Sequence, residues 1–302
     1  MQNLNDLKSQ IEKMLAAEIT HLSLKGKGDC NYAYYIETRD GRKYISKVER
    51  EHKETQDQND LVVEGNIIRQ LHDTNPSVPV PHVVFISDSP KLYIYEYIEG
   101  ELMRCAWPSL SEEEKVNICR SLGRFHAEIG KKLAKKICEE AGVDISDLTG
   151  LRPHVIEEEY DRLIADADVP EAFKDLAKEA RKIFEGTRAD AFTFQFIHND
   201  GHPENILIKD KKISGIIDFG DAEFGEVSKE FSRYVRDFPD HFGYIISSYE
   251  EVSGNKLSYA RIVSNALLSG FIDIVGLYRK GGEDRQKAEK TMIIYRGLID
   301  RI

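Results

Sequence analysis

The chain carries His198-Asn199-Asp200-Gly201-His202-Pro203-Glu204-Asn205 and, thirteen residues further on, Asp218-Phe219-Gly220. The spacing His-x-Asp-x-x-x-x-Asn followed by Asp-Phe-Gly supplies the groups that the transfer of a γ-phosphoryl group needs. The Asp200 carboxylate can orient an attacking hydroxyl and accept its proton. The carboxamide oxygen of Asn205 and the carboxylate of Asp218 can hold Mg²⁺ against a triphosphate. The pattern therefore predicts a phosphotransfer site with magnesium as its cofactor.

The residues around the two motifs predict how they are held. Apolar runs flank the first motif, so its polar residues are expected in a loop between two buried strands. Residues 206–208 form the second of these strands, 209–212 a turn, and 213–217 a further strand that ends at Asp218. A hairpin is thus expected to bring Asn205 and Asp218 to the same edge. The presence of Asp-Phe-Gly at the end of its own strand argues against a chance match to the first motif.

The first hundred residues predict an amphipathic helix followed by a small antiparallel sheet. A hairpin tip in this region carries Gly26 and Gly28, and glycine lets backbone amides approach phosphates. An ordinary glycine-bearing turn is the alternative, but the tip precedes a lysine-bearing strand, which favours a nucleotide loop. The predicted segments are a helix over 4–17 and strands over 21–24, 31–36, 43–48, 83–86 and 91–98.

Lys47 is the lysine expected to hold the phosphates. It lies among half-buried residues on the predicted strand 43–48, and a buried ammonium needs a partner. Glu64 is a polar exception on an otherwise apolar helical pattern, so we predict a Lys47–Glu64 pair that directs the lysine at the α- and β-phosphates. Lys43 competes for the same role, and a surface lysine with a solvated glutamate is the alternative interpretation.

The strand over residues 91–98 leads out of the sheet into Gly100 and is expected to form a hinge. Free backbone groups from Glu96 to Ile98 could pair with the edge of a purine. This expectation is positional, and it leaves open whether the nucleotide is ATP or GTP.

The remainder of the chain is predicted to be mostly helical. Glu157 lies in an acidic run that could face a polyamine, as could Asp237, Asp240 and Asp273, although a solvated helix face is the favoured interpretation of each. His126 and His198 are expected to be packed or hydrogen-bonded rather than to transfer protons. The helical segments are 111–142, 153–166, 171–187, 228–253 and 256–279, with Ser109, Ser111 and Ser258 as caps.

Composition is that of a water-soluble enzyme. The 302 residues are 41% hydrophobic and carry a formal net charge of -11. This charge argues against a nucleic-acid partner and is compatible with a cationic substrate, although many proteins are this acidic for solubility alone. No charge-free stretch approaches the roughly 20 apolar residues of a membrane span, and the start lacks a signal sequence. We therefore expect a cytoplasmic protein without membrane partners, either a monomer or a weak dimer.

These motifs together resemble the aminoglycoside phosphotransferase and choline-kinase-like family of small-molecule kinases. The resemblance covers most of the chain, and it is most specific at residues 198–207, with Leu122-Gly123-Arg124-Phe125-His126 as a further match. It implies an α+β, two-lobed protein-kinase-like fold, with a small β-rich N-lobe over 1–98 and a larger helical C-lobe over 99–302. Protein kinases proper place arginine after the first histidine and carry Ala-Pro-Glu, and neither is present here.

Within this group, Ile216-Ile217-Asp218-Phe219-Gly220-Asp221-Ala222 is most similar to the aminoglycoside 2''-phosphotransferases. The resemblance implies transfer of the γ-phosphate of ATP or GTP to a hydroxyl of a cationic aminoglycoside. The chain departs from the pattern at Glu230, where those enzymes carry aspartate, and at Arg233 and Arg236, where acidity would suit a cation better. A macrolide kinase, a metabolic kinase for choline, a sugar or an amino alcohol, and an inactive nucleotide-binding module are the alternatives.

Overall fold

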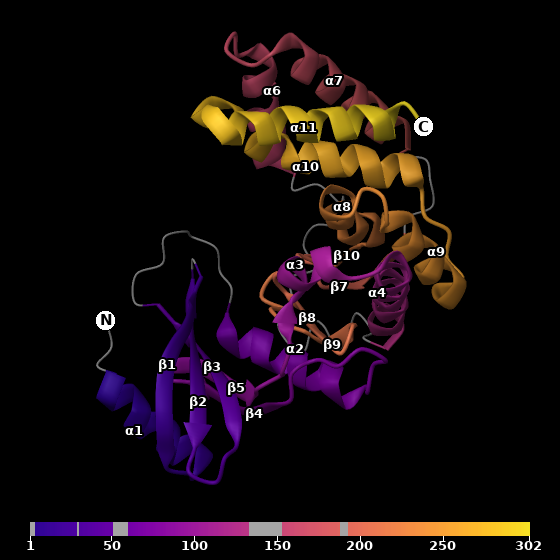
Figure 1. Ribbon diagram of the computed structural model, residues 1–302. Helices are drawn as coiled ribbons and strands as arrows, with labels where there is room; N and C mark the ends of the chain where they lie inside the picture. The colour runs from indigo at the N-terminus through magenta and orange to yellow at the C-terminus, as the bar shows by residue number, and fades with distance from the viewer. Residues whose placement is uncertain (1–3, 29, 51–59, 133–152, 188–192) are drawn as a thin grey trace. The chain divides into compact units, whose positions relative to one another are not determined.

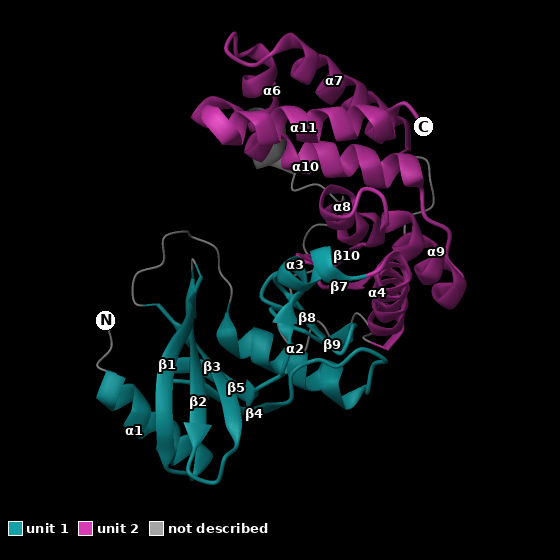
Figure 2. Cartoon of the chain, viewed as in Figure 1, with its two compact units in different colours: residues 1–110, 136–143, 204–222 teal, residues 111–135, 144–203, 223–302 magenta. Residues whose placement is uncertain are grey.

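The computed structural model describes two compact units, which Figure 2 shows in different colours. The boundary between them falls within the first motif, so Asp200 belongs to unit 2 and Asn205 to unit 1. The predicted lobe boundary at residue 98 stays a prediction. The described residues are 4–28, 30–50, 60–132, 153–187 and 193–302; of these, 4–110 and 204–222 form unit 1, and the others form unit 2.

Unit 1 is built on an antiparallel sheet in the order β1-β2-β3-β5-β4. The strand β1 is longer than predicted, because it continues through Lys25 to Lys27 and Gly26 still pairs with Ala33 of β2. A register shift between Leu24 and Gly26 accommodates the glycine within the paired strand. The strands are β1 (Ile19–Lys27), β2 (Asn31–Thr38), β3 (Lys43–Glu49), β4 (Val83–Asp88) and β5 (Lys91–Glu96).

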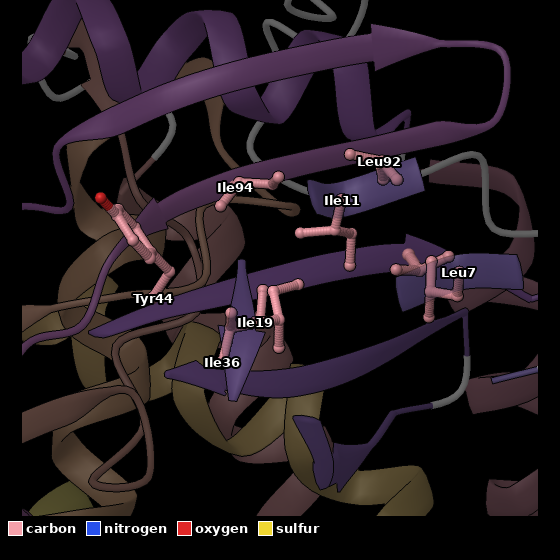
Figure 3. Close-up of a cluster of buried hydrophobic side chains, with 8 residues drawn as sticks. Leu7, Ile11, Ile19, Ile36, Tyr44, Leu92 and Ile94 are labelled. Carbon is pink, nitrogen blue, oxygen red and sulfur yellow. The ribbon is translucent and has the colours of Figure 1, made fainter. Parts of the chain in front are cut away.

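One face of this sheet is covered by the helix α1 (Leu4–Leu15), which corresponds to the amphipathic helix predicted over 4–17. Leu7 and Ile11 are four residues apart and therefore lie on the same side of the helix. Both are buried in an apolar cluster with side chains from β1, β2, β3 and β5. Figure 3 shows how Leu7 and Ile11 lie among these strand residues, which are Ile19, Ile36, Tyr44, Leu92 and Ile94.

The helix α2 (Leu61–Asp73) places Glu64 in its first turn. Asp60 caps this helix, because its side chain accepts hydrogen bonds from the backbone N–H groups of Val62 and Val63. Gly65 faces the sheet, where a Cβ atom would lie 3.2 Å from the Tyr93 Cβ. The close approach of α2 to β5 therefore carries Glu64 to the sheet.

A smaller sheet in unit 1 carries Asn205 and Asp218. Its order is β6-β8-β9, and Ile206 pairs with Ile216. The Ile217 N–H bonds to the Asn205 carbonyl at 2.9 Å, so the predicted hairpin and the shared edge are confirmed. The elements are β6 (Glu101–Leu102), α3 (Met103–Ala106), a 3₁₀ turn η1 (Trp107–Ser109), β8 (Ile206–Lys209) and β9 (Lys212–Ile216).

Unit 2 is mostly helical, and α10 runs through its core against α7, α8 and α11 (Figure 1). This helix is long and apolar enough to cross a membrane, but 61% of its apolar window is buried inside the protein. The elements are α4 (Glu112–Lys132), α6 (Pro153–Ala165), α7 (Glu171–Gly186), β7 (Phe194–Ile197), β10 (Glu223–Glu226), α8 (Val227–Asp237), α9 (Phe242–Ser253), α10 (Tyr259–Lys280) and α11 (Gly282–Ile299).

Several helix predictions needed correction. The single helix predicted over 228–253 is wrong: α8 ends at Asp237, because the following Phe238 precedes Pro239 and leaves the helical conformation. The helix α11 was not predicted at all. Ser258 caps α10, and Ser111 forms a reciprocal cap with Glu114, but Ser109 instead donates to the Ala106 carbonyl. The predicted segment 111–142 is helical up to Lys132, and its remainder lies outside the described residues.

Candidate active site

Lys47 lies between two carboxylates of unit 1. Its Nζ donates to Glu64 Oε1 at 2.9 Å and to Asp218 Oδ1 at 2.8 Å. The predicted Lys47–Glu64 pair is therefore present. Lys43 begins β3 as an exposed residue, which favours Lys47 for the central role. One ammonium group thus links the sheet, α2 and the Asp-Phe-Gly segment.

Glu64 is the hub of this cluster, with a side chain that is only 1% exposed. Besides Lys47, it accepts the hydroxyl hydrogen bond of Tyr93 at 2.8 Å and the backbone N–H of Phe219 at 3.2 Å. A buried carboxylate is stable only when its oxygens are satisfied, and here three donors converge on it. Glu64 therefore positions Lys47 and also anchors the segment that carries Asp218.

The two carboxylates keep Lys47 charged. Burial alone would lower the pKa of Lys47, but the neighbouring carboxylates of Asp218 and Glu64 more than offset it and raise the pKa above the ordinary lysine value. The Lys47 side chain is 13% exposed, whereas that of Asp218 is 44% exposed. The cluster thus combines a fixed positive charge with a carboxylate that solvent reaches.

Asn205 and Asp218 have the donor chemistry of a magnesium site. They flank the β8–β9 hairpin at one edge, and a carboxamide oxygen with a carboxylate suits a hard cation that takes its other ligands from phosphates and water. Among the described residues, no group of three or more His, Cys, Asp or Glu side chains could form a closed cage. Asp218 has φ of 67°, a left-handed conformation that aspartate adopts more readily than most residues. The residues present therefore fit Mg²⁺ bound together with a nucleotide.

The predicted nucleotide loop and hinge keep their places in unit 1. The Gly28 N–H bonds to the Asn31 carbonyl at 2.9 Å across the β1–β2 tip, and a Cβ atom at Gly26 would meet only Ala33 at 3.9 Å. Neither glycine has a positive φ, so the backbone itself does not require glycine at these positions. Their role towards phosphates stays a prediction.

At the hinge, the Glu96 N–H already bonds to the His82 carbonyl. Within the described residues the Ile98 N–H has no such bond. The Ile98 side chain packs on Gly215 of β9, where a Cβ atom would lie 2.8 Å from Ile98 Cδ1. Packing on Gly215 thus holds Ile98 in place, and its backbone N–H is available as a hydrogen-bond donor. Pairing of Glu96 and Ile98 with a purine stays a prediction.

In unit 2, the loop that carries Asp200 is held by buried hydrogen bonds. His198 is fully buried, and its Nδ1 accepts the Asp200 N–H at 3.2 Å, which is the structural role expected for it. Asn199 has φ of 62°, and its N–H donates to Glu230 Oε2 at 2.9 Å. Tyr234 packs so close to the backbone of Gly201 that only glycine fits there, because a Cβ atom would lie 2.6 Å from Tyr234 Oη. The loop is therefore fixed by contacts on both sides of Asp200.

Glu230 joins this loop to His126 on α4. Its Oε1 lies 3.7 Å from His126 Nδ1, and the other imidazole nitrogen, Nε2, lies 2.7 Å from Tyr234 Oη. Burial lowers the pKa of His126 to about 3 and raises that of Glu230. His126 is therefore a neutral packed residue, as expected. Glu230 supports the loop from the position where the sequence departs from the 2''-phosphotransferase pattern.

His202 contacts Asp200 directly. Its Nε2 lies 3.2 Å from Asp200 Oδ1, while Arg236 Nη2 lies 3.0 Å from Nδ1. The imidazole ring thus lies between the Asp200 carboxylate on one side and the Arg236 guanidinium on the other. Asp237 Oδ2 lies 3.4 Å from the same Nδ1. Burial acts to raise the pKa of Asp237, but His202 and Arg236 hold it below the ordinary value.

The predicted substrate carboxylates are not alike. Asp237 is the one that the structure brings to the Asp200 loop, through His202. Asp240 and Asp273 are exposed side chains, and the Glu157 side chain lies outside the described residues. Sequence reasoning missed His202 and Tyr93. His202 lies inside the first motif, but its contact with Asp200 is visible only in the folded chain. The same holds for the hydrogen bond from Tyr93 to Glu64.

A model of the phosphotransferase enzyme family (APH) matches residues 26–248. The chain belongs to this family. It is a phosphotransferase enzyme, and the family resemblance drawn from its motifs is confirmed. The subunit Bud32 of the KEOPS complex from Pyrococcus abyssi (strain GE5 / Orsay) is 34% identical over 86 residues, which are 28% of this chain and 34% of that protein. This match spans about a third of the length of the curated relative.

Solved phosphotransferase structures share the fold of this APH-family chain. The GDP complex of aminoglycoside 2'-phosphotransferase-IIIa has a TM-score of 0.70 at 15% identity, covering 100% of this chain and 99% of that one. The complex of APH(2")-IIa with streptomycin and ATP has a TM-score of 0.60 at 18% identity, covering 97% of both chains. The apoenzyme of macrolide 2'-phosphotransferase MphH from Brachybacterium faecium has a TM-score of 0.64 at 16% identity, covering 95% and 98%. The predicted kinase-like α+β fold is confirmed.

Proposed function

We propose that this phosphotransferase moves the γ-phosphate of ATP or GTP to a hydroxyl group of a small molecule. The observation that carries the proposal is the bonding of Lys47 Nζ to both Glu64 and Asp218, the carboxylate that follows β9. A lysine held in this way is suited to bind phosphate oxygens. The nucleotides in two of the similar structures, ATP and GDP, support a nucleoside triphosphate as the donor.

Each residue has a role in the proposed reaction. Lys47 binds the phosphates, and Asn205 with Asp218 would hold Mg²⁺, which neutralises charge on phosphate oxygens when it is bound. Asp200 orients the acceptor hydroxyl and accepts its proton as the new bond from oxygen to the γ-phosphorus forms. The bond to the β–γ bridging oxygen breaks, and the nucleoside diphosphate leaves with that oxygen. Gly26, Gly28, Glu96 and Ile98 are proposed to contact the nucleotide.

Aminoglycosides and macrolides are both acceptors to be tested. The similar structures include enzymes named for each class, so the fold does not choose between them. A metabolic kinase for a sugar, choline or an amino alcohol is the second candidate, and among these acceptors the two arginines that contact His202 favour the uncharged sugar over the cationic compounds. For an aminoglycoside, the acidic residues Glu157, Asp237, Asp240 and Asp273 are the proposed contacts.

The experiment that tests this proposal is a coupled assay that measures the release of nucleoside diphosphate from ATP or from GTP in the presence of Mg²⁺. The acceptor panel contains aminoglycosides, macrolides, choline and small sugars. Acceptor-dependent release supports the proposal and identifies the class. Nucleotide binding without release, across the whole panel, would revive the inactive binding module. We further propose a cytoplasmic monomer or weak dimer that binds neither membranes nor nucleic acid.

A further inference from the structure

Two arginines of α8 converge on the histidine that contacts Asp200. Arg233 Nη1 lies 3.5 Å from His202 Nε2, the same nitrogen that lies 3.2 Å from Asp200 Oδ1. These two distances place the Arg233 guanidinium no more than about 7 Å from the carboxylate oxygen. Arg236 reaches the other nitrogen of the ring. Two guanidinium groups therefore lie near Asp200 in a chain whose net charge is -11.

The two guanidinium groups differ in what neutralises them. Arg236 Nε lies 3.2 Å from Asp237 Oδ1, which balances its charge within the protein. Within the described residues no carboxylate lies in ion-pair distance of Arg233, although the charge of Glu230 acts on it from further away. Glu230 itself is buried and already bonded to the Asn199 N–H. Arg233 is half-buried, and a partly desolvated charge without a carboxylate in ion-pair distance favours an anion that arrives from outside.

We propose that Arg233 binds an anionic group of the acceptor, so that the acceptor is a hydroxyl compound bearing a carboxylate or a phosphate. This inference rests on the proposed function, because it names the acceptor class of the same site. The guanidinium fork matches two oxygens of a carboxylate or phosphate, which holds such a group in one orientation. A compact acceptor, whose hydroxyl and anionic group are a few bonds apart, reaches both Asp200 and Arg233.

The same geometry disfavours a polycation at this position. An amino sugar with several ammonium groups would bring like charge to Arg233, and like charges at close range oppose binding. Asp237, which also contacts His202, is already paired with Arg236. An anionic acceptor thus gives a reason for arginine at positions 233 and 236, where acidic residues would suit a cationic acceptor better.

An anion at Arg233 could also come from the γ-phosphate of the nucleotide, and the test separates the two sources. The full chain is assayed with ATP and Mg²⁺ on two pairs of compounds, each with an anionic and a neutral member: glycerate and glycerol, and glucose 1-phosphate and glucose. Kanamycin is included as a polycation. The variants are Arg233→Gln, Arg233→Lys, which keeps a point charge without the fork, and Arg124→Gln, which removes an exposed arginine of α4 as a control.

The expected result is a preference of wild type for the anionic member of a pair. Arg233→Gln should lower kcat/KM for that member by on the order of ten- to a hundredfold relative to the neutral member, the range for hydrogen bonds to charged groups. Arg233→Lys should give an intermediate loss, and Arg124→Gln should leave the ratio unchanged. Melting temperatures with and without ATP show whether each variant is folded.

Two outcomes overturn the inference while the kinase assignment stands. In the first, Arg233→Gln lowers kcat/KM equally for both members of a pair, which assigns Arg233 to the γ-phosphate. In the second, no anionic compound is turned over faster than its neutral partner, and none slows ATP hydrolysis more than its neutral partner does. A preference for kanamycin over the anionic compounds overturns the inference in the same way. Absence of nucleotide binding and of hydrolysis would instead overturn the proposed function, and the inference with it.

Discussion

Replacement of Glu64 tests whether one buried carboxylate holds Lys47 and the Asp-Phe-Gly segment together. In Glu64→Ala, Lys47 keeps Asp218, but the Tyr93 hydroxyl and the Phe219 N–H lose their acceptor. Each buried polar group left unsatisfied costs about 1–3 kcal/mol. Removal of one partner of a buried ion pair costs about 3–5 kcal/mol. We therefore expect the free energy of unfolding to fall by about 3–5 kcal/mol in Glu64→Ala.

The matched variant is Glu64→Gln, which keeps an acceptor oxygen but removes the charge. It should cost about 1–2 kcal/mol, because the carboxamide oxygen can still accept from Tyr93 or Phe219. Urea denaturation, followed by circular dichroism, measures both values. A double variant with Lys47→Met should lose less than the sum of the two single losses, because the two residues interact directly.

The contradicting result is a loss of less than about 1 kcal/mol in both Glu64 variants, the level of an ordinary surface ion pair. Additive losses of Glu64→Ala and Lys47→Met would also refute the reasoning. Nucleotide affinity provides a second measurement, since Glu64→Gln should weaken ATP binding through the loss of a positioned Lys47.

Three further predictions concern the loop, the buried histidine and the metal. Gly201→Ala should cost about 1–3 kcal/mol in urea denaturation, because its Cβ would meet Tyr234 Oη at 2.6 Å; Gly243→Ala, with nothing within 4 Å, is the control and should cost nothing. The pKa of His126 is lowered to about 3, so its contribution to stability is complete above the unfolded pKa of 6.5 and is lost as pH falls towards 3. Relative to His126→Gln, wild type should lose about 2 kcal/mol between pH 6.5 and 5, and a difference that is independent of pH would contradict the buried neutral imidazole. Asp218→Asn should abolish the dependence of ATP affinity on Mg²⁺ in a titration, and an unchanged titration would remove Asp218 from the metal site.

The parts of the site that sequence could predict are those encoded locally. Two apolar runs separated by a turn were enough to place Asn205 and Asp218 at one edge, because a hairpin needs only two strands that are adjacent in the sequence. Glu64 was recognisable as the partner of Lys47, since it is a charged residue on an apolar helical face. Both predictions used patterns within a few tens of residues.

The parts that sequence missed depend on contacts between distant elements. The bond from Asn199 to Glu230 and the approach of His202 to Asp237 join residues more than 30 positions apart, and no periodicity encodes them. The helix α11 was missed because its first half is charged, and its buried residues gather mainly in the second half. The break between α8 and α9 was encoded by Pro239, whose effect on the preceding residue outweighs the apolar periodicity.

The most direct test of the central claim compares phosphoryl transfer and nucleotide binding in wild type and Asp200→Asn. We predict that Asp200→Asn lowers kcat for the best acceptor by about 10²–10⁴, the contribution of a general base, while the dissociation constant for ATP with Mg²⁺ stays within about threefold. A variant that keeps its turnover, or that loses nucleotide affinity to the same extent as turnover, would contradict the assignment of Asp200 as the base of a phosphotransfer site.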